Sequence, residues 1–305
     1  MRRPSDFPAQ GAYSGRRHFL RVLGLGLVAG IAVPGRLRGA FAQEEESEDA
    51  KILRAVFRRA HEENLADGGI GGVVAGIGGM FVGTPYAAHT LEAPGAEHLV
   101  VNLRAFDCVT FVESALAIAR CIRRGAVSLE EFRRELTTIR YRSGVIDGYA
   151  SRLHYFSEWV ADNEKKGIVR DVAADIGGVR RLKTLDFMSR HRSAYRQLED
   201  ETTFDRITAI ERKLSAQRQA YVPLGMVASV EGRIESGDVI ALTVSTEGLD
   251  VSHTGIAVDS DGNLRYLHAP LSGGEVRYTS QPLDEYLRGR PAVTGIMVVR
   301  PMEPA

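Results

Sequence analysis

The sequence predicts an α+β fold in which a buried helix packs on an antiparallel sheet. Residues 106–124 carry a wide apolar face at helical spacing, which is typical of a central helix. The last third of the chain contains short apolar runs of strand length between residues 239 and 299. The Asp-Ser-Asp-Gly-Asn segment at 259–263 separates two of these runs and indicates a hairpin. A helical region followed by antiparallel strands favours the α+β class.

The N-terminal region has the pattern of an export signal. The first 42 residues carry seven arginines and one aspartate, while the remainder carries 32 basic and 38 acidic residues. Arg16-Arg17 precede Phe19-Leu20, and an uncharged run of 12 residues follows from Val22 to Val33, too short for a helix to cross a bilayer of roughly 30 Å. These features resemble a twin-arginine signal over 1–42, cleaved after Ala42, and predict a periplasmic protein. A retained membrane anchor is the alternative.

The rest of the chain is predicted to form a flexible acidic linker over 43–50 and a catalytic domain over 51–305. This domain has a cysteine-bearing half at about 51–125, a helical and loop insertion at about 126–233 and a β-sheet half at about 234–300. Its mild negative charge argues against nucleic acid as a partner. No segment after the signal is long and apolar enough to span a membrane.

Individual elements follow from local patterns. Residues 51–64, 106–124 and 128–139 have helical spacing, whereas 141–160 show no clean period and 204–220 are compatible with either a helix or a strand. The glycine-rich segment 68–83 lacks both a Gly-Lys-Ser/Thr sequence and a GxGxxG helix start, so nucleotide binding is not expected. The predicted strands are 239–244, 253–258, 264–268 and 292–299.

Two cysteines remain after the signal, Cys108 and Cys121. They lie 13 residues apart on one predicted helix, which separates their Cα atoms by roughly 20 Å. A disulfide requires about 4.4–6.8 Å, so both are expected to be free thiols. Asp107 is a plausible N-cap that places Cys108 at the helix N-terminus, where backbone N–H groups favour a thiolate and stabilise an oxyanion. Cys121 faces the predicted core.

Two histidines are candidate partners of Cys108. His253 begins one predicted strand and His268 ends the next, so hairpin pairing can place the two imidazoles side by side. His253 would then act as the base and His268 would orient it. Satisfied burial and metal ligation are common alternatives, and an open zinc site of one cysteine and two histidines is conceivable.

Five motifs follow one another along the chain in the order found in the NlpC/P60 cysteine peptidase superfamily, which the sequence therefore resembles. These motifs are Gly83-Thr-Pro-Tyr86, Asp107-Cys108, Gly237-Asp238, His253-Thr-Gly-Ile256 and Leu267-His-Ala269. Asp-Cys-Val-Thr replaces the usual Asp-Cys-Ser-Gly. Together with Val101-Asn-Leu103 and Ser151–Phe156, this form resembles the DUF1460 group, from about residue 51 to the C-terminus.

The resemblance implies a papain-like fold and N-acetylmuramoyl-L-alanine amidase activity on peptidoglycan or (anhydro)muropeptides, with no metal or cofactor. It implies Cys108 as nucleophile, His253 as base and His268 as orienting residue, with Tyr86 beside the thiol. The expected substrate contacts are Asp107, Thr110, Arg152, His154, Tyr155 and Ser252. Arg152, His154 and Tyr155 offer donors and an aromatic face for a glycan or a carboxylate.

Other functions remain open at this point. The same scaffold can serve a D-glutamyl endopeptidase that cuts within the stem peptide. A lipid hydrolase or acyltransferase is a second possibility within the enzymes. A wall-binding protein without catalysis is the alternative from a different class.

Overall fold

The computed structural model describes residues 47–305, apart from 93 and 261. The predicted signal over 1–42 lies outside the described residues, as does the first half of the predicted linker, 43–46. The first helix, α1 (Glu48–Glu62), begins before the expected end of that linker at residue 50. Ser47 caps it by accepting the N–H of Ala50, and the acidic Glu48 and Asp49 suit a helix N-terminus, so the linker boundary was placed too late.

The helices that follow α1 build one layer of the molecule. The predicted helices at 106–124 and 128–139 are confirmed as α3 (Cys108–Arg123) and α4 (Leu129–Arg140). Every side chain of α3 from Thr110 to Cys121 is buried, so this helix is central. The other helices of the layer are α2 (Ile70–Met80) and α5 (Phe156–Lys165). Among the described residues, no helix is long and apolar enough to cross a membrane.

The sheet is antiparallel at every strand pair, and its order is β2-β3-β8-β4-β5-β6-β7, with β1 also paired to β8. The four predicted strands are confirmed as β4 (Val239–Val244), β5 (Val251–Ser260), β6 (Asn263–His268) and β8 (Val293–Pro301). Three further strands lie in the predicted insertion, so the sheet extends beyond the half expected at 234–300. The remaining strands are β1 (Val169–Asp171), β2 (Val179–Arg181), β3 (Gln219–Pro223) and β7 (Arg277–Tyr278).

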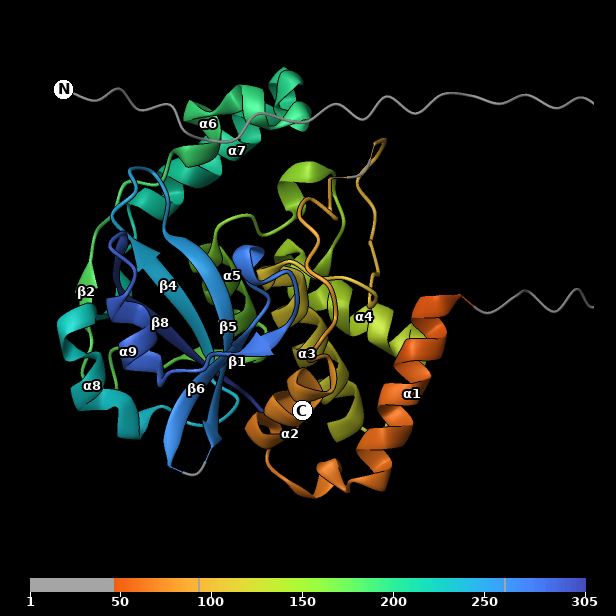
Figure 1. The fold of residues 1–305 in the computed structure, drawn as a ribbon. Helices are drawn as coiled ribbons and strands as arrows, with labels where there is room; N and C mark the ends of the chain where they lie inside the picture. The colour runs from red at the N-terminus through yellow and green to blue at the C-terminus, as the bar shows by residue number, and fades with distance from the viewer. Residues whose placement is uncertain (1–46, 93, 261) are drawn as a thin grey trace, which may run out of the picture. The chain divides into compact units, whose positions relative to one another are not determined.

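Helices cover both faces of this sheet (Figure 1). The larger hydrophobic core joins α1–α5 to one face, and includes Val239 and Ala241 of β4. The second core lies between the other face and the short helices α8 (Val227–Val230) and α9 (Leu283–Arg288). β4 contributes Ile240 and Leu242 to this core, so all six of its side chains are buried, as expected for a strand covered on both faces.

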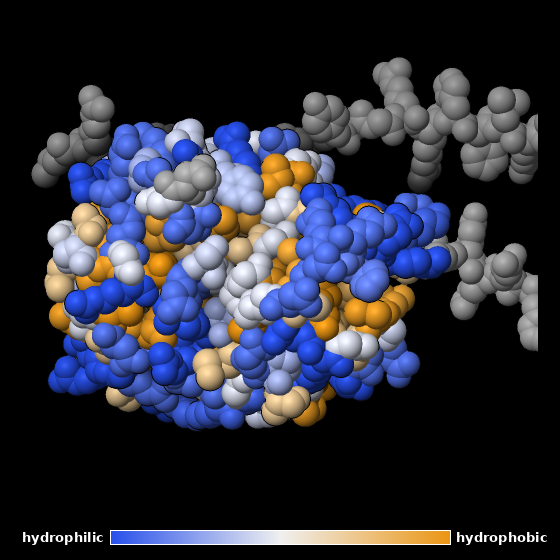
Figure 2. All heavy atoms as spheres, turned by 90° about the horizontal axis from the view of Figure 1, so that it is seen from below, coloured by the Kyte–Doolittle hydropathy of each residue, from blue (hydrophilic) through white to orange (hydrophobic). Residues whose placement is uncertain are grey.

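The predicted insertion contains a third, smaller core around α6 (Phe187–Arg190) and α7 (Glu201–Ser215). The ambiguous segment 204–220 is therefore both helical and extended, because α7 ends at Ser215 and β3 begins at Gln219. Figure 2 shows a mostly hydrophilic outer face with hydrophobic residues in several patches, as is usual for a surface in contact with water. The mixed helix and antiparallel sheet confirm the α+β class.

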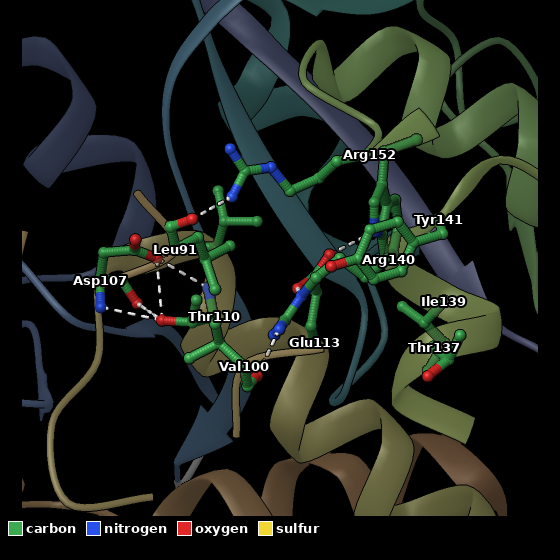
Figure 3. Close-up of polar contacts among 12 residues, drawn as sticks. Leu91, Val100, Asp107, Thr110, Glu113, Thr137, Ile139, Arg140, Tyr141 and Arg152 are labelled. Carbon is green, nitrogen blue, oxygen red and sulfur yellow. Dashed lines mark hydrogen bonds and ion pairs between the residues drawn. The ribbon is translucent and has the colours of Figure 1, made fainter. Parts of the chain in front are cut away.

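A buried ion pair fixes α3 to its neighbours (Figure 3). Arg140 of α4 donates from Nε to Glu113 Oε2 at 2.7 Å, and both side chains are about 3% exposed. Trp159 of α5 donates from Nε1 to the other oxygen of Glu113 at 3.2 Å. Arg140 also binds the carbonyl of Val100 at 2.7 Å. Glu113 thereby links α3 to α4 and α5, at a point about one and a half turns after the start of α3.

Candidate active site

Cys108 is the first residue of α3, and Asp107 caps the helix. Asp107 Oδ1 accepts the N–H of Val109 at 3.0 Å and that of Thr110 at 2.8 Å, while Thr110 Oγ1 accepts the N–H of Asp107 at 2.9 Å. This reciprocal pair is a capping box (Figure 3). The polar groups of Asp107 and Thr110, expected to contact substrate, therefore hold the first turn that carries the thiol.

The same cap limits the oxyanion donors that the helix can supply. The amides of Val109 and Thr110 are engaged by Asp107 Oδ1, and the amide of Phe111 donates to the Asp107 carbonyl at 3.1 Å. The fourth amide of the turn, that of Cys108, lies beside its own sulfur. The expectation of several free helix amides is thus wrong, and within this turn the donor next to the thiol is the Cys108 amide, while the Thr254 amide donates from β5.

The electrostatics of Cys108 favour a thiol at rest. Its pKa is raised to about 11, mainly by burial and in part by the negative charge of Asp107. Hydrogen bonds from the backbone and side chain of Thr254 lower the pKa but do not reverse the shift. The helix N-terminus therefore does not by itself make the thiolate the resting form at neutral pH, and a base must remove the proton, as the predicted role of His253 requires. Both cysteines are free, and Cys121 is buried as predicted.

The two histidines meet through the β5–β6 hairpin. His253 Nε2 lies 2.7 Å from His268 Nδ1, which confirms the predicted juxtaposition. The rings cross at 77° with centroids 5.0 Å apart. If His253 carries its proton on Nε2 and donates it to His268, then His253 Nδ1 keeps a free lone pair. That tautomer is the one that can accept a proton from a thiol.

Burial keeps both imidazoles neutral. It lowers the pKa of His253 to about 4, with a further contribution from the positive charge of Arg290. It lowers the pKa of His268 to about 3, with contributions from His253, Arg290 and Arg277. At pH 7 the resting pair is a neutral imidazole beside a neutral imidazole, so each retains one nitrogen lone pair.

Thr254 joins the cysteine segment to the histidine segment. Its Oγ1 donates to the carbonyl of Cys108 at 2.9 Å, and it directly follows His253 on β5. The N-terminus of α3 therefore lies against the start of the strand that carries the candidate base. Sequence analysis missed Thr254, although its place within the His-Thr-Gly-Ile motif was a signal that could have found it.

Tyr86 lies in the same region, half-buried in the segment before Phe106. Its amide donates to Gly274 at 2.7 Å, and the next amide, that of Ala87, donates to Phe106 at 2.9 Å. Burial raises the pKa of Tyr86 to about 12, and the negative charges of Cys108 and Asp107 raise it too. The phenol is therefore protonated near the thiol and is a potential hydrogen-bond donor.

The residues predicted to form a substrate wall are instead bonded to protein groups. Arg152 is 4% exposed and donates to Leu91 O at 2.8 Å and to Glu92 Oε1 at 2.5 Å (Figure 3 shows the first bond). His154 Nε2 lies 2.9 Å from Tyr149 O, and burial lowers the pKa of His154 to about 3. Tyr155 donates to Glu211 at 2.7 Å. These side chains stabilise the insertion, because charged and polar groups inside a fold need such partners.

Ser252 is the predicted contact that does face an open space. It is exposed and lines a cavity of about 500 Å³ together with His253, Tyr286 and Arg290. Sequence analysis missed Tyr286 and Arg290. They precede the last strand by a few residues, and no local pattern relates them to His253.

Comparison with known proteins identifies the family. The sequence profile of the AmiA-like family, described as N-acetylmuramoyl-L-alanine amidase-like, matches residues 76–296. The chain belongs to this family. Among curated proteins, no significant match is found.

Solved structures agree with this membership. An N-acetylmuramoyl-L-alanine amidase from Bacteroides uniformis is 36% identical, with a TM-score of 0.74 over 77% of this chain and 100% of that one. A Bacteroides fragilis protein, provisionally named a xylanase, is 40% identical, with a TM-score of 0.70; the match covers 73% of this chain and 98% of that one. A Legionella pneumophila protein of the DUF1460 group is 24% identical, with a TM-score of 0.62; the match covers 84% of this chain and 96% of that one, and it shows a shared fold.

Proposed function

We propose that this amidase-family protein hydrolyses the bond between N-acetylmuramic acid and L-alanine in peptidoglycan or released (anhydro)muropeptides. In this proposal it is a cysteine hydrolase of the NlpC/P60 type with a papain-like arrangement, and it acts in the periplasm after export. The observation that carries the proposal is the pairing of His253 with His268, on a strand that touches the Cys108 residue at the start of α3. The name of the Bacteroides uniformis relative supports the choice of bond.

The neutral resting pair defines the first step. His253 Nδ1 accepts the proton of the Cys108 thiol as the sulfur attacks the lactyl carbonyl of muramic acid. His268 Nδ1 accepts from His253 Nε2 and stabilises the imidazolium that forms. The amides of Cys108 and Thr254 bond to the sulfur, and these amides together with the nearby Tyr86 hydroxyl are the candidate donors for the tetrahedral oxyanion.

The second half of the reaction returns the enzyme to its resting form. His253 protonates the amine of L-alanine as the carbon–nitrogen bond breaks, and a thioester remains on Cys108. Water then attacks the thioester while His253 takes one of its protons, and the sulfur leaves and is reprotonated. The products are a muramic acid carboxylate and a peptide with a free amino terminus.

Two cysteine variants test the mechanism. Cys108→Ala should abolish release of peptide from a defined muropeptide, whereas Cys121→Ala should retain it, because Cys121 is buried in the main core. Mass analysis of the products shows which bond is lost. Release of a glycan-free peptide that begins with L-alanine supports the amidase, and cleavage at the D-glutamyl bond supports the endopeptidase. A Cys108→Ala enzyme that still releases peptide at the wild-type rate would refute the cysteine mechanism.

A further inference from the structure

A basic cavity adjoins the histidine pair. His253 lines a cavity of about 500 Å³, and His268 lines a neighbouring one of about 290 Å³. Both share the same four residues, which are Pro270, Ser272, Tyr286 and Arg290. The smaller cavity adds Arg277, and neither cavity has an acidic lining residue.

The two arginines of this cavity contrast with the neighbouring Arg288. Arg288 pairs with Asp284 at 2.5 Å, whereas Arg290 packs on the Tyr286 ring, with its guanidinium carbon 4.2 Å from the ring centroid. Stacking on one face leaves the N–H edge of a guanidinium available to an anion. Arg277 is exposed, and its guanidinium lies over Gly273 at the mouth of the loop that follows β6.

Two further observations connect this charge to the site. Arg290 lowers the pKa of both histidines, so its positive charge reaches the imidazoles. The Tyr286 hydroxyl is buried beside Arg290, whose guanidinium can only donate to it, and no acceptor for the hydroxyl proton is found among the described residues. A buried O–H without an acceptor is costly, and a ligand oxygen in the cavity would satisfy it.

The reaction itself determines which half of the substrate occupies the cavity, and this step rests on the proposed function. The leaving amine must take its proton from His253, so the amine side of the cleaved bond lies on the imidazole side of the site. That side carries the peptide. The residue after L-alanine in a stem peptide is D-isoglutamate, whose free α-carboxylate lies one residue from the leaving amine.

We propose that Arg290, supported by Arg277 and the Tyr286 hydroxyl, binds the carboxylate of the second peptide residue and selects substrates in which this carboxylate is free. A guanidinium that packs over an aromatic ring can still present paired N–H donors that match a carboxylate. Arg290 is thus a specificity residue, and the cavity is the peptide subsite.

A matched pair of substrates tests the subsite. They are N-acetylmuramoyl-L-alanyl-D-isoglutamate and its D-isoglutamine counterpart, in which a carboxamide replaces the carboxylate. The wild type should favour the carboxylate by about 10- to 100-fold in kcat/KM, the range of one charge-assisted hydrogen-bonded pair. In Arg290→Gln this preference should fall to within about threefold. Arg288→Gln, an exposed arginine already paired with Asp284, should keep the wild-type ratio.

The outcomes separate the subsite from the proposed function. If every variant releases peptide from both substrates with equal kcat/KM, the amidase stands and the subsite is refuted. If neither substrate is cleaved at the amide by any variant, the proposed function itself fails. Should Arg290→Gln fold poorly by thermal unfolding, Arg290→Lys keeps the charge but loses the paired donors, and an intermediate ratio is then expected. An unchanged ratio in the folded lysine variant would also overturn the proposal.

Discussion

Replacement of His268 by alanine isolates the contribution of the second imidazole. The side chain is 3% exposed and its Nδ1 lies 2.7 Å from His253 Nε2. At rest this is a hydrogen bond between neutral groups, but it becomes charge-assisted when His253 takes the thiol proton. The bond therefore stabilises the transition state more than the ground state.

The magnitude follows from the number of bonds lost. One hydrogen bond to a charged group contributes about 1.5–3 kcal/mol, so His268→Ala should lower kcat/KM by about 10- to 100-fold. His268→Asn retains a side-chain carbonyl that can accept from His253 Nε2, and it should recover part of the loss. Kinetics on a defined muropeptide measure both values. The rate of Cys108 alkylation by iodoacetamide, followed against pH, reports separately on the thiol.

The control is thermal unfolding, because a buried imidazole also fills space. Both variants lose volume, so a purely structural role predicts similar activity for the two once the folded fraction is equal. A His268→Ala enzyme with wild-type kcat/KM would refute the orienting role. So would an asparagine variant that is no more active than the alanine variant.

Three further predictions concern the fold and its pH dependence. Arg140→Met should destabilise the protein by about 3–5 kcal/mol in chemical denaturation, because it leaves the Glu113 carboxylate buried without its cation. The double variant with Glu113→Gln should recover much of this loss of stability, because it removes the unpaired charge as well. Arg152→Met should lower the unfolding temperature, because it removes the hydrogen bonds to Leu91 and Glu92. It should leave kcat/KM per folded molecule within about threefold of the wild-type value. A selective loss of activity in the folded variant would instead support a role for Arg152 in substrate binding. His154, His253 and His268 should each contribute more to the free energy of unfolding at about pH 6.5 than at about pH 4, because the unfolded chain binds protons in this window that their buried neutral imidazoles do not. Buried carboxyls with a raised pKa, such as Asp171 at about 6, act in the opposite direction, so the contribution is isolated by comparing wild type with His154→Phe in denaturation at about pH 4 and about pH 6.5. The stability difference between the two proteins should be larger at about pH 6.5.

The geometry of the histidine pair was predictable because it depends on local sequence. Two short apolar runs flank a turn, and strand pairing then fixes which residues are opposite one another. Ile256 pairs with Leu267, so the β5 residue opposite His268 is two positions from His253. Both histidines therefore lie on the same face of the sheet. Cys108 was predictable as a helix start for a similar reason, since Asp107 and Thr110 form the cap within four residues.

Other elements depend on contacts that no short segment encodes. β1 and β2 are three residues long, and each exists by pairing with a strand at least about 40 residues away in sequence, while the two-residue β7 forms only by pairing with β6. α2 contains many glycines, which ordinarily disfavour a helix. A Cβ at Gly78 would lie 3.0 Å from both Ile256 and Leu267, so these glycines allow the helix to pack closely on β5 and β6.

The side chains of the predicted substrate wall show a different limit. Arg152 and Tyr155 have the chemistry of ligand contacts, but their acceptors, Glu92 and Glu211, lie about 60 residues away in the chain. Spacing alone does not reveal whether a polar group already has a partner. The same limit hid Arg290, whose relation to His253 arises only when the turn after α9 packs beside β5.

The position of β8 sets the order in which the molecule can be assembled. This strand, Val293–Pro301, pairs with β4 on one side and with β1 and β3 on the other. A chain still being synthesised lacks the strand that joins the two halves of its sheet, and long-range pairings of this kind form late in folding. Until that strand is in place, β4 lacks its pairing partner on one side. If the protein acts as proposed, we therefore expect a chain that ends before Val293 to be inactive, because the sheet that carries His253 and His268 is incomplete without β8.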